Sequence, residues 1–273
     1  MPELPDLEVI KDFLQERIVG RRIEGVEVLR PIVIRNLTEQ DFSAALVGRE
    51  LVGIRRRGKF LILILDSGDI LAINPMLAGR LHYCPPGQRR HARTYLILHL
   101  AGSMDLRYVD PRSMGKIYLT ADLALVPGFA TQGPEVLDPA LSREVFAERL
   151  RRHRGEIKGV LTNQRFVAGI GNAYADEILF RAGIYPFRKR PSLSVEEIEA
   201  LYEAMRSVLT EATAILRERV GEEIHVEWRD FLQVHGKGGS PCPRCGTAIS
   251  EIRANRRITN FCRRCQPGTL TSS

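Results

Sequence analysis

The first residues of the chain carry groups that could act as a covalent catalyst. The sequence begins Met1-Pro2-Glu3, and an initiator methionine is normally trimmed before a small residue such as proline. Trimming would leave Pro2 with a free secondary amine, which can attack an aldehyde-level carbon and form an iminium. An α-amino group titrates at about 7.7–8.0, so a useful fraction is unprotonated at neutral pH. Glu3 could protonate a leaving oxygen beside it, but most N-terminal prolines have no such role.

Four of the five cysteines suggest a metal site. Cys242 and Cys245 form one C-x2-C pair, Cys262 and Cys265 form another, and sixteen residues separate the pairs. Paired knuckles at this spacing are typical of a tetrahedral Zn²⁺ site, which we expect to be structural. Two disulfides are the alternative, and a cytoplasmic context would disfavour them. Cys84 stands alone, and we expect it to be an ordinary thiol.

Basic residues recur along the whole chain and give it a net charge of +7. Runs such as Arg55–Arg57 and Arg188–Arg190 fit either contact with a polyanion or a solvated basic surface. No apolar run reaches the ~20 residues that a membrane span requires. The acidic start does not resemble a signal peptide, so we expect a cytoplasmic protein without a membrane partner.

The candidate amine precedes a predicted helix. Apolar residues recur with helical spacing over residues 5–19, a glycine follows at Gly20, and Pro5 suits a first helical turn. The amine would then lie near the positive end of the helix. That end disfavours an ammonium group and should keep more of the amine neutral.

The chain then changes to a strand pattern between about 22 and 120. Turn residues separate short apolar runs at 66–69 and 101–103. Six or more short strands without intervening helices favour a β-sandwich or a barrel. The predicted strands are Ile23–Leu29, Phe60–Leu65, Asp69–Asn74, Thr94–Leu100, Met104–Val109 and Lys116–Leu119.

Helical patterns dominate the second half of the chain. Residues 121–140 read as a linker, and helices are predicted at about 142–152, 156–163, 172–181 and 194–217. The glycines of 168–172 precede a helix, where the backbone could approach a phosphate, although such pairs are usually tight turns. We therefore predict an α+β protein. Its parts are a helix plus β-sandwich domain at 1–120, a linker at 121–140, a helical domain at 141–238 and a zinc-finger hairpin at 239–267.

Several motifs in this order resemble the formamidopyrimidine-DNA glycosylase / endonuclease VIII family of base-excision repair enzymes. They are Pro2-Glu3-Leu4-Pro5, Arg57-Gly58-Lys59-Phe60, Asp110-Pro111-Arg112, Gly133-Pro134-Glu135, VAGIGNAYADEIL at 167–179 and the cysteine module. The resemblance covers essentially the whole chain. It implies a helix–two-turn–helix element in the helical domain and one structural zinc ion.

The resemblance also implies catalytic roles. Pro2 matches the nucleophile that forms a Schiff base with C1′ of the damaged nucleotide, and Glu3 matches the acid that assists opening of the sugar ring. Lys59 matches a lysine at the tip of a β-hairpin that is credited with β-elimination and phosphate contact. Arg257 matches a zinc-finger arginine that binds phosphates and is linked to δ-elimination.

Further residues match DNA contacts of the family. A base inside a duplex must be flipped out before it can react, and side chains wedged into the gap fill its place. The wedge positions correspond to Leu77, Arg112 and Met114. Phosphate binding is implied for Lys158 and Asn172, and the resemblance suggests further DNA contacts at Arg152 and His91.

The expected function is therefore that of a bifunctional DNA glycosylase and apurinic/apyrimidinic lyase. Its partner would be double-stranded DNA that contains damaged bases or abasic sites. We expect a monomer in the cytoplasm of a bacterial-type cell, associated with the nucleoid. Residues 219–238 lack the Gly/Ser/Thr-rich run that caps a flipped 8-oxoguanine in related enzymes. Weak 8-oxoguanine excision is expected, with hydantoins or oxidised pyrimidines as the better substrates.

Two other functions fit part of the sequence. The wedge positions depart from the usual family residues, so the same scaffold could recognise damaged or bent DNA without cutting it. The presence of Pro2, Glu3, Lys59 and Arg257 argues against such a binder. An RNA-associated zinc-ribbon protein would account for the cysteines but leaves the amino terminus unexplained.

Overall fold

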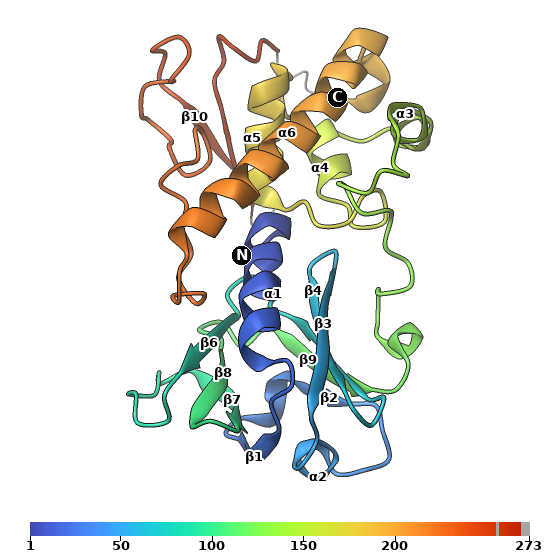
Figure 1. Ribbon diagram of the computed structural model, residues 1–273. Helices are drawn as coiled ribbons and strands as arrows, with labels where there is room; N and C mark the ends of the chain where they lie inside the picture. The colour runs from blue at the N-terminus through green and yellow to red at the C-terminus, as the bar shows by residue number, and fades with distance from the viewer. Residues whose placement is uncertain (255–256, 269–273) are drawn as a thin grey trace. The chain divides into compact units, whose positions relative to one another are not determined.

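The computed structural model describes residues 1–254 and 257–268, and Figure 1 labels most of its helices and strands. The chain divides into two compact units. The first comprises Met1–Thr131 and Thr213–Trp228, and the second comprises Gln132–Ala212 and the chain from Arg229 on. The first unit thus includes the end of the long helix α6 (Val195–Arg219) and the segment after it, whereas we expected domains made of continuous stretches. No helix among the described residues is long and apolar enough to cross a membrane.

Helix α1 (Leu4–Ile18) begins directly after the candidate catalytic residues. Its apolar side chains recur on one face and are buried, while Glu3 occupies the N-cap position and Pro5 lies in the first turn. The carboxylate of Asp6 accepts a hydrogen bond from the backbone N–H of Glu3 at 2.8 Å. This bond satisfies a donor at the helix start and fixes the direction of the chain there.

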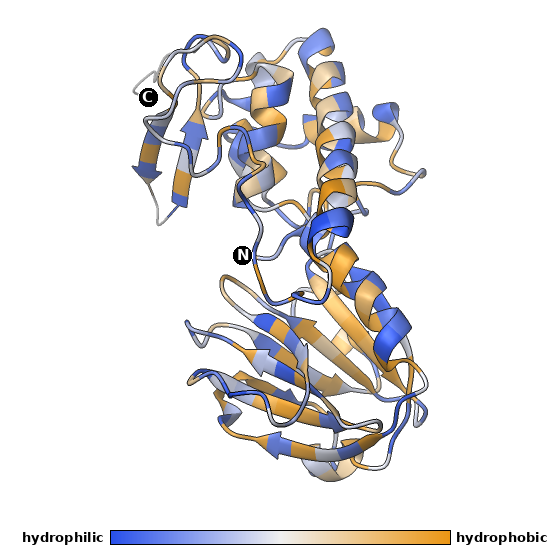
Figure 2. Ribbon diagram, turned by 60° about the vertical axis from the view of Figure 1, so that its left-hand side comes forward, coloured by the Kyte–Doolittle hydropathy of each residue, from blue (hydrophilic) through white to orange (hydrophobic). Residues whose placement is uncertain are grey.

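The strands of the first unit form two sheets that face each other (Figure 2). One has the order β1-β7-β8-β6 and the other β2-β9-β5-β4-β3. All neighbours are antiparallel except β2 and β9. The strands are β1 (Ile23–Val28), β2 (Ile34–Asn36), β3 (Leu51–Arg57), β4 (Phe60–Leu65), β5 (Ile70–Asn74), β6 (Arg80–Cys84), β7 (Thr94–Leu100), β8 (Met104–Val109) and β9 (Lys116–Thr120).

The predicted β-sandwich is confirmed, and the six predicted strands agree with the structure to within a residue at either end. The strands β2, β3 and β6 were not predicted. Three of the seven residues of β3 are arginines, and β6 has only five residues, with Arg80 and His82 among them, so neither strand contains an apolar run. Short helical turns, α2 (Phe42–Leu46), η1 (Pro31–Val33) and η2 (Leu123–Leu125), complete the unit.

The second unit is helical and ends in a β-hairpin. Its helices are α3 (Arg143–Arg151), α4 (Ile157–Leu161), α5 (Asn172–Ala182), η3 (Arg190–Ser192) and α6 (Val195–Arg219), and its hairpin strands are β10 (Ser250–Ala254) and β11 (Arg257–Phe261). The residues of α6 up to Ala212 belong to this unit. The helix α5 ends at Gly183, whose φ of +73° closes the helix in a left-handed conformation. The predicted helices and the cysteine hairpin are confirmed.

A buried histidine makes the first unit sensitive to acid. His82 on β6 is 4% exposed, and its ring packs against His225, with the ring centroids 4.1 Å apart. Burial, followed by the neighbouring His225, His91 and Arg107, lowers the pKa of His82 to about 4. An unfolded chain would instead protonate this histidine near pH 6.5. Between pH 6.5 and pH 4 the unfolded state binds more protons than the folded state. The contribution of neutral His82 to stability is therefore complete above pH 6.5 and is lost as the pH falls toward 4.

We expect acidification from pH 7 to pH 4.5 to reduce the free energy of unfolding through His82 by about 1–3 kcal/mol. Urea unfolding at several pH values would measure the loss. The variant His82→Gln should show a correspondingly flatter dependence on pH over this range. An unchanged slope in that variant would contradict the assignment.

Candidate active site and nucleic-acid interface

The amino terminus places Pro2 and Glu3 at the start of a packed helix. Pro2 is buried, and Glu3 is only 1% exposed. The carbonyl of Glu3 accepts the backbone N–H of Leu7 at 3.0 Å, so Glu3 already belongs to the hydrogen-bond pattern of α1. The nitrogen of Pro2 therefore precedes the helix directly, and its position is set by the buried face of α1.

Lys59 lies in a two-residue turn between β3 and β4. Arg57 pairs with Phe60 across the turn, and Gly58 has a φ of +55°, a conformation that favours glycine. The predicted place of Lys59 at the tip of a β-hairpin agrees with this geometry. Its role in β-elimination stays a prediction.

Arg56 connects this hairpin to helix α1. Helix α1 packs against β3 and β4. The Arg56 guanidinium lies 2.6 Å from the Glu8 carboxylate of α1, and it also donates to the carbonyl of Gly58 at 3.1 Å. Burial alone would raise the pKa of Glu8, but hydrogen bonds from Lys11 and Arg56 outweigh it and hold the pKa below its ordinary value. Arg56 could not be identified from the sequence, because its partner Glu8 is 48 residues away.

Two loops of the first unit present apolar side chains to solvent. Leu77 is 39% exposed and Met76 is 38% exposed in the loop between β5 and β6. Met114 is 38% exposed in the loop between β8 and β9, where Arg112 is also exposed. Isolated exposed apolar residues are common, but side chains that enter a base stack must be exposed in this way. The wedge roles of Leu77, Arg112 and Met114 stay predictions.

Buried neighbours hold both loops in shape. The Asp110 carboxylate accepts the backbone N–H groups of Met114 at 2.8 Å and Gly115 at 2.7 Å. The hydroxyl of Tyr108 would lie 1.6 Å from a Cβ added at Gly115 and 2.1 Å from one added at Gly79. Only glycine fits at these two positions, so both loops close against the same tyrosine.

In the second unit, Lys158 and Asn172 meet at the hairpin strand β11. Lys158 is buried, and its Nζ lies 2.6 Å from the Asp176 carboxylate, 3.0 Å from the Ile258 carbonyl and 2.9 Å from Thr259 Oγ1. Asn172, the first residue of α5, donates to the same Ile258 carbonyl at 2.7 Å. Both residues thus hold the hairpin against α4 and α5. Their predicted phosphate contacts stay predictions.

The other predicted DNA contacts are exposed. Arg257, the first residue of β11, donates to Thr162 Oγ1 at 3.2 Å just after α4. The side chain of Arg152 is 73% exposed and lies 3.9 Å from Glu148. His91 is exposed in the loop before β7 of the first unit. Exposed arginines suit phosphate binding, but nothing in the contacts of Arg257 and Arg152 distinguishes them from other surface arginines.

Two buried acids of α5 have structural partners. The Glu177 carboxylate accepts the backbone N–H groups of Gln233, Val234 and His235 at 2.8–2.9 Å. Burial raises the pKa of Glu177 above its ordinary value, although these three donors oppose the shift. Asp176 accepts a hydrogen bond from the backbone N–H of Asn260 at 3.1 Å and forms the ion pair with Lys158. These acids fix the path of the chain into the zinc finger and the position of β11.

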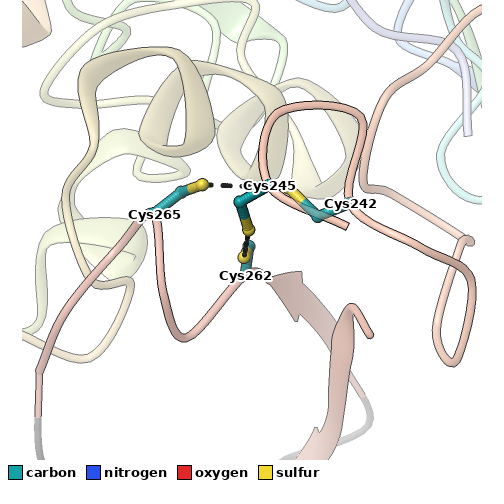
Figure 3. Close-up of side chains that lie close together, drawn as sticks. All are labelled: Cys242, Cys245, Cys262 and Cys265. Atoms are coloured by element: carbon teal, nitrogen blue, oxygen red, sulfur yellow. Dashed lines mark hydrogen bonds between the residues drawn. The ribbon is translucent and has the colours of Figure 1, made fainter. Parts of the chain in front are cut away.

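The four paired cysteines converge on one point (Figure 3). Their sulfur atoms all lie within 4.8 Å of one another, with Cys242 and Cys265 3.8 Å apart and Cys245 and Cys262 3.4 Å apart. A disulfide would need sulfur atoms about 2.05 Å apart. A tetrahedron of sulfurs around Zn²⁺ at about 2.3 Å has edges of about 3.8 Å. The site therefore suits one structural zinc ion, and none of the five cysteines forms a disulfide.

Family models match all three parts of the chain. The formamidopyrimidine-DNA glycosylase N-terminal domain matches residues 1–117, and the H2TH domain of the same enzymes matches residues 132–222. A zinc finger found in FPG and IleRS matches residues 239–268. The expected order of a β domain, a helix–two-turn–helix domain and a zinc finger is therefore confirmed.

Curated relatives and solved structures agree with these matches. The formamidopyrimidine-DNA glycosylase of Symbiobacterium thermophilum is 40% identical over 98% of this chain and 90% of its own length. That of Pelotomaculum thermopropionicum is 38% identical over 97% of this chain and 99% of its own. A complex between the Lactococcus lactis Fpg and an abasic site containing DNA has a TM-score of 0.88 and 31% identity, covering 97% of this chain and all of that one. The chain belongs to the formamidopyrimidine-DNA glycosylase family and is a DNA glycosylase.

Proposed function

We propose that this glycosylase excises oxidised bases and then cleaves the abasic strand through a Schiff base at Pro2. The observation that carries the proposal is the position of Pro2 and Glu3, directly before a packed helix that Arg56 ties to the Lys59 turn. Similar proteins support the substrate class, since one solved structure similar to this chain holds a Lactococcus lactis FPG mutant with a Fapy-dG containing DNA.

The reaction would begin at the nitrogen of Pro2. Its lone pair forms a bond to C1′ while the bond between C1′ and the base breaks, and the electron pair leaves with the base. The Pro2 nitrogen releases its proton, which the departing base takes up, so the nitrogen regains a lone pair. Glu3 then protonates the ring oxygen of the sugar, and the ring opens to an iminium. The iminium acidifies the 2′ hydrogens. Lys59 would remove one of them, and the 3′ phosphate leaves in a β-elimination.

The second unit would supply the final steps. Arg257 would bind a phosphate and assist a second elimination that releases the 5′ phosphate, after which water hydrolyses the iminium. Phosphate contacts position a protein on DNA without reading bases, so we propose low sequence specificity. Each such contact releases a counterion, so binding should weaken steeply with salt. We further propose that the enzyme acts at the nucleoid in a bacterial-type cytoplasm.

We propose hydantoins or oxidised pyrimidines as better substrates than 8-oxoguanine. The segment between α6 and Cys242 lacks a Gly/Ser/Thr-rich run that could cap 8-oxoguanine. Its residues 220–228 are folded into the first unit, where Val220 and Ile224 are buried. A segment anchored in this way leaves few residues to close over a flipped purine.

A lesion panel with borohydride tests the function. Duplexes with a hydantoin, an oxidised pyrimidine, 8-oxoguanine opposite cytosine, or an abasic site would be incubated with the enzyme and sodium borohydride. We expect a covalent protein–DNA adduct with the abasic duplex and with the hydantoin or pyrimidine lesion. Binding without any adduct would favour the non-catalytic alternative. Preferred excision of 8-oxoguanine would overturn the substrate preference alone.

A further inference from the structure

The segment after α6 places a carboxylate at the amino terminus. Glu227 Oε1 accepts a hydrogen bond from the Met1 amine at 2.8 Å, and its Oε2 accepts from Arg80 at the start of β6. The side chains of Glu227 and Arg80 are 29% and 16% exposed. Buried Ile224 and the packing of His225 on His82 hold the segment in the first unit. Glu227 is therefore positioned by packed neighbours.

This carboxylate lies close to the nitrogen that trimming of Met1 would expose. Three covalent bonds separate the Met1 nitrogen from the Pro2 nitrogen, and they span at most about 4 Å. Glu227 Oε1 therefore lies within about 7 Å of the Pro2 nitrogen, by adding this span to the hydrogen bond. Once Met1 is removed, Glu227 loses one partner and keeps Arg80, while a new amine appears beside it.

We propose that Glu227 is a further catalytic residue beside the Pro2 amine of the trimmed enzyme, accepting its proton during attack and facing the iminium that follows. The inference rests on the proposed lyase function. It gives the segment that follows α6 a role in catalysis, and it explains why a buried anchor and an arginine hold an acid at the amino terminus.

The proton and electron movements balance. On an abasic aldehyde, the lone pair of Pro2 forms the bond to C1′, and the carbonyl electron pair moves to oxygen. The proton of the amine passes to Glu227 and then to that oxygen, while Glu3 supplies a second proton. The oxygen leaves as water as the nitrogen lone pair forms the iminium. The regenerated Glu227 carboxylate then stands near the positive charge.

The pH dependence of adduct formation tests this role. A nearby carboxylate favours the protonated amine, so Glu227→Gln should shift the pH midpoint of borohydride trapping lower by about 0.5–1 unit. The rate above that midpoint should fall about three- to tenfold, because the iminium loses its neighbouring negative charge. Glu227→Asp, whose carboxylate is retracted by one methylene, should show smaller changes in the same directions. If Glu227→Gln does not fold, the pH midpoint and rate of Glu227→Asp would test the proposal instead.

A matched control lies in the same segment. Glu222 is 81% exposed and lies 3.7 Å from Arg17, so Glu222→Gln removes the same charge away from the amino terminus. Its midpoint and rate should equal those of the unaltered enzyme. If the Glu227 variants also keep the unaltered profile, the proposal is wrong and Glu227 only anchors the segment. If the unaltered enzyme gives no adduct at any pH, the proposed lyase function itself fails.

Discussion

An enzyme whose Pro2 is preceded by an additional residue is expected to form at least about a thousandfold less borohydride-trapped adduct than the trimmed enzyme. In the extended chain the Pro2 nitrogen is part of a tertiary amide, and its lone pair is delocalised into the carbonyl. It can neither attack C1′ nor become an iminium. The measurement is the initial rate of adduct formation with an abasic duplex, with DNA binding followed in parallel.

A cleavable extension provides the control for this prediction. If the extension ends at a protease site directly before Pro2, cleavage produces the trimmed enzyme from the same preparation. The cleaved sample should regain the full rate. Mass spectrometry would establish which terminus is present. An uncleaved enzyme that cuts abasic DNA at the full rate would contradict a mechanism based on Pro2.

Loss of zinc should have the second large effect. The core of the finger consists mainly of the cysteines with Phe180, Val234 and Ile249, which is too small to fold without the metal. Structural Zn²⁺ contributes about 10–16 kcal/mol to folding of comparable zinc-finger peptides. The variant Cys262→Ser should lose zinc and weaken duplex binding by about ten- to a hundredfold. Metal analysis and fluorescence anisotropy at one fixed salt concentration would measure both effects.

Loss of zinc should weaken DNA binding because the hairpin strand β11 is held by residues of α4 and α5. The Ile258 carbonyl on β11 accepts from both Lys158 and Asn172, so an unfolded finger removes a partner from each and releases Arg257 from its place beside Thr162. The sheets of the first unit should still unfold cooperatively. As a control, Cys84→Ala alters a buried cysteine of β6 and should leave zinc content and DNA binding unchanged. Unaltered affinity in a zinc-free Cys262→Ser enzyme would refute this account.

Elements that depend on the spacing of neighbouring residues could be predicted from the sequence. The apolar spacing of residues 5–19 indicated α1, and the C-x2-C pairs indicated a sulfur tetrahedron that the structure reproduces. The strand β4 was visible because its apolar run is bounded by turn residues. In each case the residues that form the pattern are close together in the sequence, so their spacing was enough to predict the local structure.

The charged strand β3 was not predicted from the sequence. The residues Arg55, Arg56 and Arg57 read as a basic run, yet they lie in β3, where pairing with β4 determines the conformation. Backbone hydrogen bonds to a neighbouring strand do not depend on the side chain, so a polar sequence can form a strand when its partner is strongly apolar.

Only the tertiary structure decided which distant residues meet. The amino acids themselves predicted the candidate nucleophile, the metal ligands and the order of the domains. Folding paired Arg56 with Glu8, Lys158 with Asp176, and Glu227 with the amino terminus 226 residues away. It also joined residues 213–228 to the first unit. Such contacts leave no period in the sequence, because each depends on how complete elements pack rather than on the residues beside it in the chain.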